Sequence, residues 1–145
     1  GHFRMIAPDA NVVLDGQKSV RILRVHKFAH LSVAGLTFQN GALIIPEKSR
    51  KQANTGGANG AGILVGSGAT LEALNCKFLN NMSRNFHARW GQGAGIKGDP
   101  KSTIHVWNSE FRGNVAGGGG AIGVSKARLL VVAHCLFEDN IADGG

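Results

Sequence analysis

The sequence predicts an all-β fold, a single-stranded parallel β-helix in which short strands wind into a solenoid of about four full coils plus a partial N-terminal coil. Three observations predict it: an apolar pattern that recurs four times, a fixed spacing between two apolar positions in every copy, and 22 glycines in 145 residues. This glycine content is about twice the usual share. Glycine shows no period of three, which excludes collagen.

Each copy of the pattern ends on a phenylalanine. The coils are centred on Phe38, Phe78, Phe111 and Phe137. Small or apolar residues lie two, five and seven positions before each of them; in the last copy these are Cys135, Val132 and Leu130. This pattern is typical of a strand that buries one face. We therefore expect one strand that leads up to each phenylalanine.

A second apolar position lies fifteen residues before each phenylalanine. It holds Leu23, Ile63, Ile96 and Ile122. Glycine-rich turns directly precede the last three, at residues 60–62, 93–95 and 119–121. Glycine adopts backbone angles that other residues resist, so these turns allow the chain to corner between short strands. Each coil is therefore expected to hold a second strand in fixed register with the first.

An asparagine follows three residues after the phenylalanine in three copies, as Asn81, Asn114 and Asn140, and the first copy has Asn40-Gly41 there instead. Stacked coils place equivalent positions over one another. We therefore expect ladders of Phe on Phe, Ile on Ile and Asn on Asn, the last a structural feature because stacked amides satisfy each other and the backbone.

The copies differ in length at one corner, between the phenylalanine of one coil and the isoleucine of the next. The resulting insertions are residues 42–59 and 82–92. Residues 11–16 are interpreted as part of a further, partial coil. The chain as a whole, residues 1–145, is interpreted as one β-helix fragment of a longer protein, and unpaired strands at its ends predict end-to-end or larger assembly.

The motif Gly-Gly-Ala-Ile followed by Leu-x-Val-x-x-Cys-x-Phe-x-x-Asn, over residues 119–140, resembles the repeat of chlamydial polymorphic outer membrane proteins and of the wider pectin-lyase-like superfamily. Residues 30–41 resemble an early coil of the same superfamily. The resemblance covers about residues 9–145 and implies a right-handed helix, as does the general rule for parallel crossovers. It implies an extracellular or cell-surface location, but the same fold carries adhesins and polysaccharide-processing enzymes.

An enzyme on such a fold needs carboxylates gathered on the outer face of neighbouring strands. The outward positions beside the phenylalanines are mixed instead. Lys77 beside Glu110, and Arg112 beside Glu138, are predicted to form exposed cross-strand ion pairs. The sequence thus predicts no catalytic residue.

No metal or cofactor site is predicted either. Cys76 and Cys135 lie two coils apart, about 9.6 Å, beyond the limit of about 7 Å for a disulfide, so both are expected to be free. His26 and His30 have ligand-like spacing, but they span a predicted turn and no cysteine or carboxylate joins them in sequence.

The formal net charge is +7, and the two insertions carry four of these charges. Because both leave the same corner of adjacent coils, we expect them to be neighbours that form one basic, aromatic-edged binding patch. Its predicted residues are Lys48, Arg50, Lys51, Arg84, Phe86, His87, Arg89 and Trp90. The expected partner is an acidic polysaccharide or an acidic protein surface; no groove-reading module for nucleic acid is present. A pair of solvated loops without a ligand is the open alternative.

These features favour a non-catalytic structural, adhesive or assembly module of an extracellular or surface protein. The alternative is the non-catalytic portion of a polysaccharide lyase or glycoside hydrolase whose catalytic coils lie elsewhere. No apolar run in the sequence is long enough for a membrane span.

Overall fold

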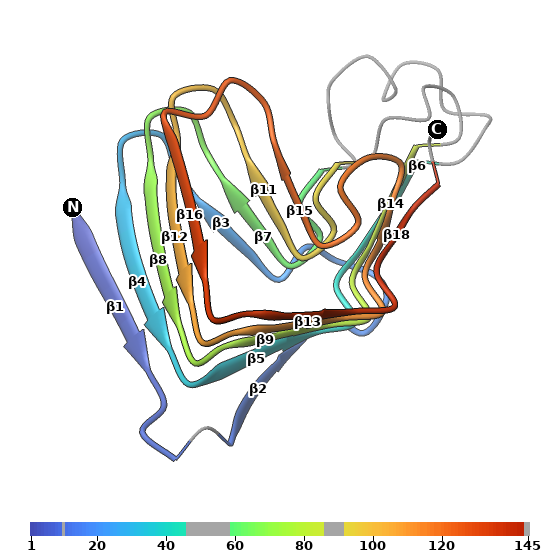
Figure 1. Ribbon diagram of the computed structural model, residues 1–145, viewed down its shortest axis with the longest axis horizontal. Helices are drawn as coiled ribbons and strands as arrows, with labels where there is room; N and C mark the ends of the chain where they lie inside the picture. The colour runs from blue at the N-terminus through green and yellow to red at the C-terminus, as the bar shows by residue number, and fades with distance from the viewer. Residues whose placement is uncertain (10, 46–58, 86–91, 144–145) are drawn as a thin grey trace.

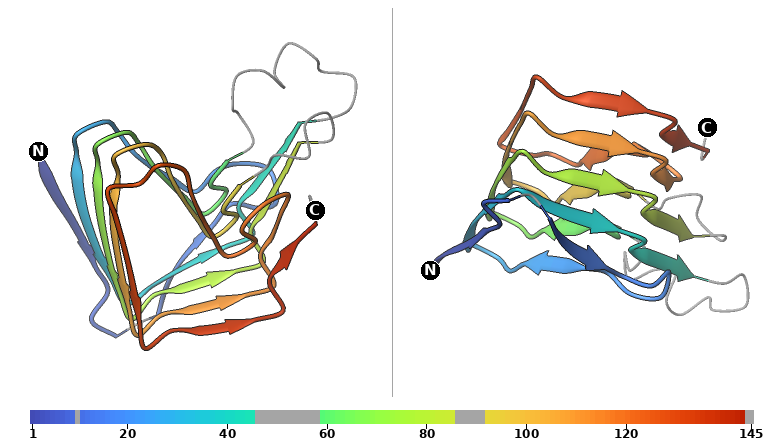
Figure 2. Two further views of the ribbon diagram at one scale, coloured as in Figure 1. Left: turned by 45° about the horizontal axis from the view of Figure 1, so that its top comes forward. Right: turned by 90° about the horizontal axis from the view of Figure 1, so that it is seen from below.

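Eighteen short strands and no helix are found in the residues that the computed structural model describes, which are 1–9, 11–45, 59–85 and 92–143. All strand pairs are parallel, and the strands stack in four sheets (Figure 1). From β4 onward the chain visits the sheets in a constant order, which we label A, B, D and C, and then returns to A one level further along the stack (Figure 2); the first pass, from β1 to β3, has strands in A, B and C. An all-β fold with stacked parallel strands is thereby confirmed, and it fits a parallel β-helix.

Sheets A and B each hold five strands. Sheet A consists of β1 (His2–Ile6), β4 (His30–Ala34), β8 (Thr70–Leu74), β12 (Thr103–Trp107) and β16 (Leu129–Ala133). Sheet B consists of β2 (Val12–Asp15), β5 (Leu36–Gln39), β9 (Lys77–Leu79), β13 (Glu110–Arg112) and β17 (Leu136–Glu138).

Sheets C and D each hold four strands. Sheet C consists of β3 (Leu23–Val25), β7 (Ile63–Val65), β11 (Ile96–Gly98) and β15 (Ile122–Val124). Sheet D consists of β6 (Ala42–Ile45), β10 (Met82–Asn85), β14 (Val115–Ala116) and β18 (Ile141–Ala142).

The expectation of one strand leading up to each phenylalanine is wrong, because a corner divides it between sheets A and B. The corner residue has a positive φ in every coil: Gly35 (68°), Asn75 (53°), Asn108 (46°) and His134 (53°). A residue in this left-handed region turns the chain sharply, and glycine and asparagine adopt it at the lowest cost. The corner lies in the three-residue interval between the apolar positions that are five and two residues before each phenylalanine.

A second left-handed corner lies between sheets B and D. It is formed by Asn40, Asn80, Gly113 and Asp139, with φ between 53° and 60°. After this corner the chain forms the strands of sheet D, and β6 and β10 occupy the first four residues of the two predicted insertions.

The interior consists of the predicted ladders. Phe38, Phe78 and Phe111 are fully buried, and the four phenylalanine rings stack with centroids 5.2, 4.7 and 4.9 Å apart and nearly parallel planes. Ile96 pairs with Ile63 on one side and Ile122 on the other. Stacked aromatic pairs stabilise by about 0.5–1.5 kcal/mol beyond the burial of their area.

The asparagine ladder is also confirmed. Nδ2 of Asn81 donates to the carbonyl oxygen of Phe38 (3.1 Å) and to Oδ1 of Asn114 (3.0 Å). Asn114 repeats this pattern one coil further with Phe78 and Asn140, at 2.8 Å each. In the first coil the backbone N–H of Gly41 donates to Oδ1 of Asn81 (2.9 Å). These side chains satisfy backbone groups that the corner leaves without a sheet partner.

The N-terminal strand β1 was not expected. Phe3 and Met5 pair with Leu31 and Val33 of β4, so residues 2–6 extend sheet A. The strand expected within residues 11–16 is present as β2, where Leu14 pairs with Phe38.

Candidate functional site

Most of the predicted basic patch lies outside the described residues. These members are Lys48, Arg50, Lys51, Phe86, His87, Arg89 and Trp90. Arg84, in β10, is described, and its guanidinium contacts Oδ2 of Asp143 at 2.5 Å. Because Arg84 is already paired with a carboxylate, its charge is partly neutralised before any partner binds.

The chain ends that carry the two insertions lie side by side. Ala42 of β6 pairs with Met82 of β10 before the loops. After the loops, Asn59 forms a parallel bridge with Gln92, whose backbone N–H donates to Oδ1 of Asn59 (2.9 Å). Both insertions therefore leave from and return to neighbouring positions, as the repeat spacing predicts.

The outward carboxylates of sheet B are engaged in structural contacts. Arg112 contacts both Glu110 and Glu138, the latter at 2.9 Å. The predicted Arg112–Glu138 pair is thus confirmed. Lys77 is in register with Glu110, but the carboxylate turns to the guanidinium of Arg112 instead, so the predicted Lys77–Glu110 ion pair is wrong. A guanidinium presents a fork of donors that can contact two carboxylates at once.

The carboxylate of Asp15, at the end of β2, is also engaged in structural contacts. It accepts hydrogen bonds from the side chains of Gln39 (2.8 Å) and Asn40 (3.1 Å) and from the backbone N–H of Gln17 (2.7 Å). The bond from Gln39, followed by those from Gln17 and Asn40, lowers the pKa of Asp15. Asp15 is therefore an ionised group that anchors a corner.

The outer face of sheet A brings together two histidines and a carboxylate from three successive strands. His2 (β1), His30 (β4) and Glu72 (β8) place one ligand-type atom each within 4.8 Å of one another. The rings of His2 and His30 stack with centroids 3.9 Å apart. Nε2 of His30 lies 3.2 Å from Oε2 of Glu72. We call these three residues the His–Glu cluster.

Ser32 links the members of the His–Glu cluster. Its hydroxyl donates to Oε2 of Glu72 (2.7 Å), and its Oγ lies 3.0 Å from Nε2 of His2. The hydrogen bond from Ser32 is the main cause that lowers the pKa of Glu72, and the neighbouring His30 and His105 act in the same direction. The carboxylate is therefore ionised at neutral pH.

His105 continues this face on β12, in register with Glu72. Its ring packs edge-on against Trp107, with centroids 5.2 Å apart. The Nε2 atom of His105 is buried without a hydrogen-bond partner. His105 thus adds a third imidazole to this face, although it lies outside the His–Glu cluster.

Sequence spacing missed this cluster for an identifiable reason. Ser32, Glu72 and His105 all lie six residues before their phenylalanine, so the repeat predicts that they are neighbours. His2 lies twelve residues before Leu14, whereas its sheet partner His30 lies eight before Phe38. Because the corner between β1 and β2 is longer than the equivalent corner of the next coil, the repeat spacing does not align His2 with His30. The pair His26 and His30, which drew attention by spacing, does not form the cluster.

Both cysteines are free, as predicted. Cys76 is buried, and this burial raises the pKa of its thiol. Its position beneath the corner, where its backbone N–H donates to Oγ of Ser109 (3.1 Å), is that of a small core residue.

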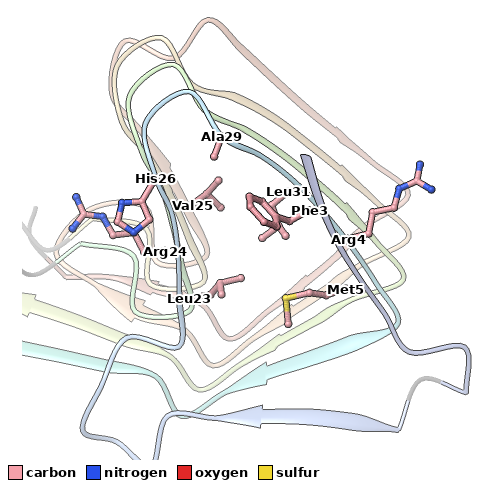
Figure 3. Close-up of a pocket in the computed structure, with 9 residues that line it drawn as sticks. All are labelled: Phe3, Arg4, Met5, Leu23, Arg24, Val25, His26, Ala29 and Leu31. Atoms are coloured by element: carbon pink, nitrogen blue, oxygen red, sulfur yellow. The ribbon is translucent and has the colours of Figure 1, made fainter. Parts of the chain in front are cut away.

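A cavity of about 350 Å³ opens at the N-terminal end of the stack. Figure 3 shows the apolar side chains of the lining directed into it, while Arg4, Arg24 and His26 point away. With no polar group converging on its interior, this cavity is the uncovered end of the hydrophobic core and offers no chemistry of its own.

Among the residues that the structure describes, no helix has the length and apolar content needed to cross a membrane. No protein-family model, curated protein or solved structure matches the chain.

Proposed function

We propose that the chain is a non-catalytic structural, adhesive or assembly module of an extracellular or cell-surface protein, built as a right-handed β-helix of about four full coils plus a partial N-terminal coil. By its repeat motif it is related to the pectin-lyase-like superfamily and nearest to polymorphic outer membrane protein repeats. The right hand follows from the general rule that connections between parallel strands of one sheet are right-handed in about 98% of cases.

The observation that carries the proposal is the unbroken stacking of identical side chains. Phe38, Phe78 and Phe111 are fully buried, and the rings of Phe38, Phe78, Phe111 and Phe137 stack with centroids 5.2, 4.7 and 4.9 Å apart. Levels that stack in this regular way build a stiff, repetitive surface, which repeat proteins use as scaffolds and binding surfaces.

The outer face of sheet B supports a non-catalytic role. Glu110, Glu138 and Asp15 on this sheet each have a structural partner, whereas a glycosidase needs a pair of carboxylates free to transfer a proton. An acidic partner at the basic insertions is part of the proposal, because the ends of both loops lie on adjacent coils.

The test is a panel of neutral and anionic polysaccharides incubated with the 145-residue chain, with binding measured by calorimetry and products by mass spectrometry. We expect binding to anionic polymers that weakens as salt rises, because exposed charges are screened, and no cleavage product. Cleavage at any rate above the buffer control would contradict the non-catalytic role.

A matched pair of variants tests the patch itself. The triple variant Lys48→Ala, Arg50→Ala, Lys51→Ala is compared with a control in which three exposed cations elsewhere, Lys27, Lys101 and Arg128, are changed to alanine. Three contacts of about 0.3 kcal/mol each predict an affinity loss of about fivefold for the first variant and little for the second. Equal losses would show that net charge alone attracts the polymer.

A further inference from the structure

We propose that His2, His30 and Glu72 bind a divalent transition-metal ion of the zinc class on the outer face of sheet A. The inference is independent of the role proposed above. Two imidazoles and one carboxylate form a donor set typical of zinc, with a fourth position left for water or an external ligand. Calcium and magnesium favour oxygen ligands alone, so the imidazoles select against them.

The geometry is close to what zinc requires. Ligand atoms at about 2.0–2.2 Å from a tetrahedral zinc lie about 3.3–3.6 Å from each other. Nε2 of His30 and Oε2 of Glu72 are already 3.2 Å apart, and all three ligand atoms lie within 4.8 Å. His2 is exposed, so its ring can leave the stack with His30 and the contact with Ser32 in order to complete the set.

The present contacts leave the cluster incompletely satisfied. Nε2 of His30 is buried and lies 3.2 Å from Oε2 of Glu72, without the alignment of a regular hydrogen bond. In its deprotonated form this nitrogen can donate its lone pair to a metal ion. Ser32 already orients the carboxylate through its hydroxyl (2.7 Å), as outer-shell partners of metal ligands do.

The three ligands come from three successive strands of sheet A, β1, β4 and β8. A metal ion held here therefore crosslinks three levels of the stack across a surface that otherwise consists of separate side chains. Because only the folded chain brings these residues together, binding should raise the unfolding temperature.

The experiment is a calorimetric titration of the 145-residue chain with zinc chloride at about pH 7.5, because protons compete with the metal for the ligand atoms at lower pH. We expect one zinc ion per chain. His30→Gln and Glu72→Gln should each lower the affinity by at least about tenfold. Both side chains are on the outer face and partly exposed, so these variants keep the interior ladders intact, which circular dichroism verifies.

Two controls make the outcome specific. His26→Gln removes an exposed histidine outside the cluster and should change the affinity by less than about twofold. Acetylation of the Gly1 amine blocks a chelate between that amine and His2 and should leave the affinity unchanged. A second readout is the unfolding temperature, which zinc should raise in the unmodified chain and not in Glu72→Gln.

Three results would overturn the proposal. The first is the absence of zinc binding up to about 100 µM. The second is a loss of affinity in His26→Gln as large as in His30→Gln. The third is loss of binding on acetylation, which would assign the metal to the amine of Gly1 and not to the cluster.

Discussion

Lys97 is a buried cation in strand β11, where its neighbours are Ile96 and Gly98. It is 3% exposed, and its Nζ donates to the carbonyl oxygen of Gly98 at 2.8 Å. Burial lowers the pKa of this ammonium group below its ordinary value of 10.5, and Asp99 opposes the shift less strongly. A charge held in this position destabilises the folded state relative to an apolar side chain of similar length.

The burial of Lys97 leads to a prediction for this single residue. The folded pKa of Lys97 lies below the unfolded pKa, so the unfolded chain binds more protons between the two values and wild-type stability gains with rising pH in that window. Lys97→Met should therefore be more stable than wild type at pH 7, with an advantage that shrinks as the pH approaches 10.5. Urea unfolding of both proteins at each pH measures this, and a constant difference would contradict it.

At the scale of the element, the turns between sheets B and D depend on the asparagine ladder. Asn114 is fully buried. Its Oδ1 accepts from the backbone and the side chain of Asn81 (3.1 and 3.0 Å), and its Nδ2 donates to Phe78 and Asn140 (2.8 Å each). The strands of sheet D are short, with two residues in β14, so this side chain provides much of the polar contact between coils at that corner.

Removing this amide should be severe. Asn114→Ala leaves buried backbone groups of Asn81 and Phe78 without partners, and we expect a loss of about 2–4 kcal/mol of unfolding free energy. Asn140→Ala should cost less, because Asn140 is partly exposed at the end of the ladder and water can replace its contacts. The midpoints of urea denaturation compare the stability of the two variants. Similar losses of stability would show that the ladder stabilises the fold through side-chain volume alone and not through its hydrogen bonds.

At the scale of the whole molecule, the last coil exposes side chains that belong to a core. Leu130 and Val132 of β16 and Phe137 of β17 are 39%, 38% and 48% exposed, while their equivalents one coil earlier are fully buried. These residues surround an edge where no strand follows among the described residues. An apolar end of this kind favours association, since stacking would bury both the side chains and the strand edges.

We predict that the 145-residue chain self-associates through this end as its concentration rises. Val132→Lys places a charge on the inward side of β16 and should keep the protein monomeric. Leu129→Lys is the matched control, because Leu129 is exposed to a similar extent (44%) but faces outward on the same strand. Light scattering over a concentration series measures the mass, and equal effects of the two variants would locate the contact elsewhere.

The amino-acid pattern alone determines the repetitive part of this protein: which residues stack as ladders, where the glycine turns lie, and that the strands are parallel. It does so because each coil repeats the same local spacing, so residues at equivalent positions of stacked coils lie in contact. Phe38, Phe78 and Phe111 could thus be placed over one another from their positions in the chain.

Only the tertiary structure decided where each apolar segment turns and which side chains outside the repeat meet. The corners at Gly35 and Asn75 depend on single left-handed residues within an otherwise continuous apolar pattern. The meeting of His2, His30 and Glu72 depends on a corner of unequal length between β1 and β2. Local spacing predicts contacts only while the corners between strands keep the same length; where they differ, the hydrogen-bonded register of the sheet decides which side chains meet.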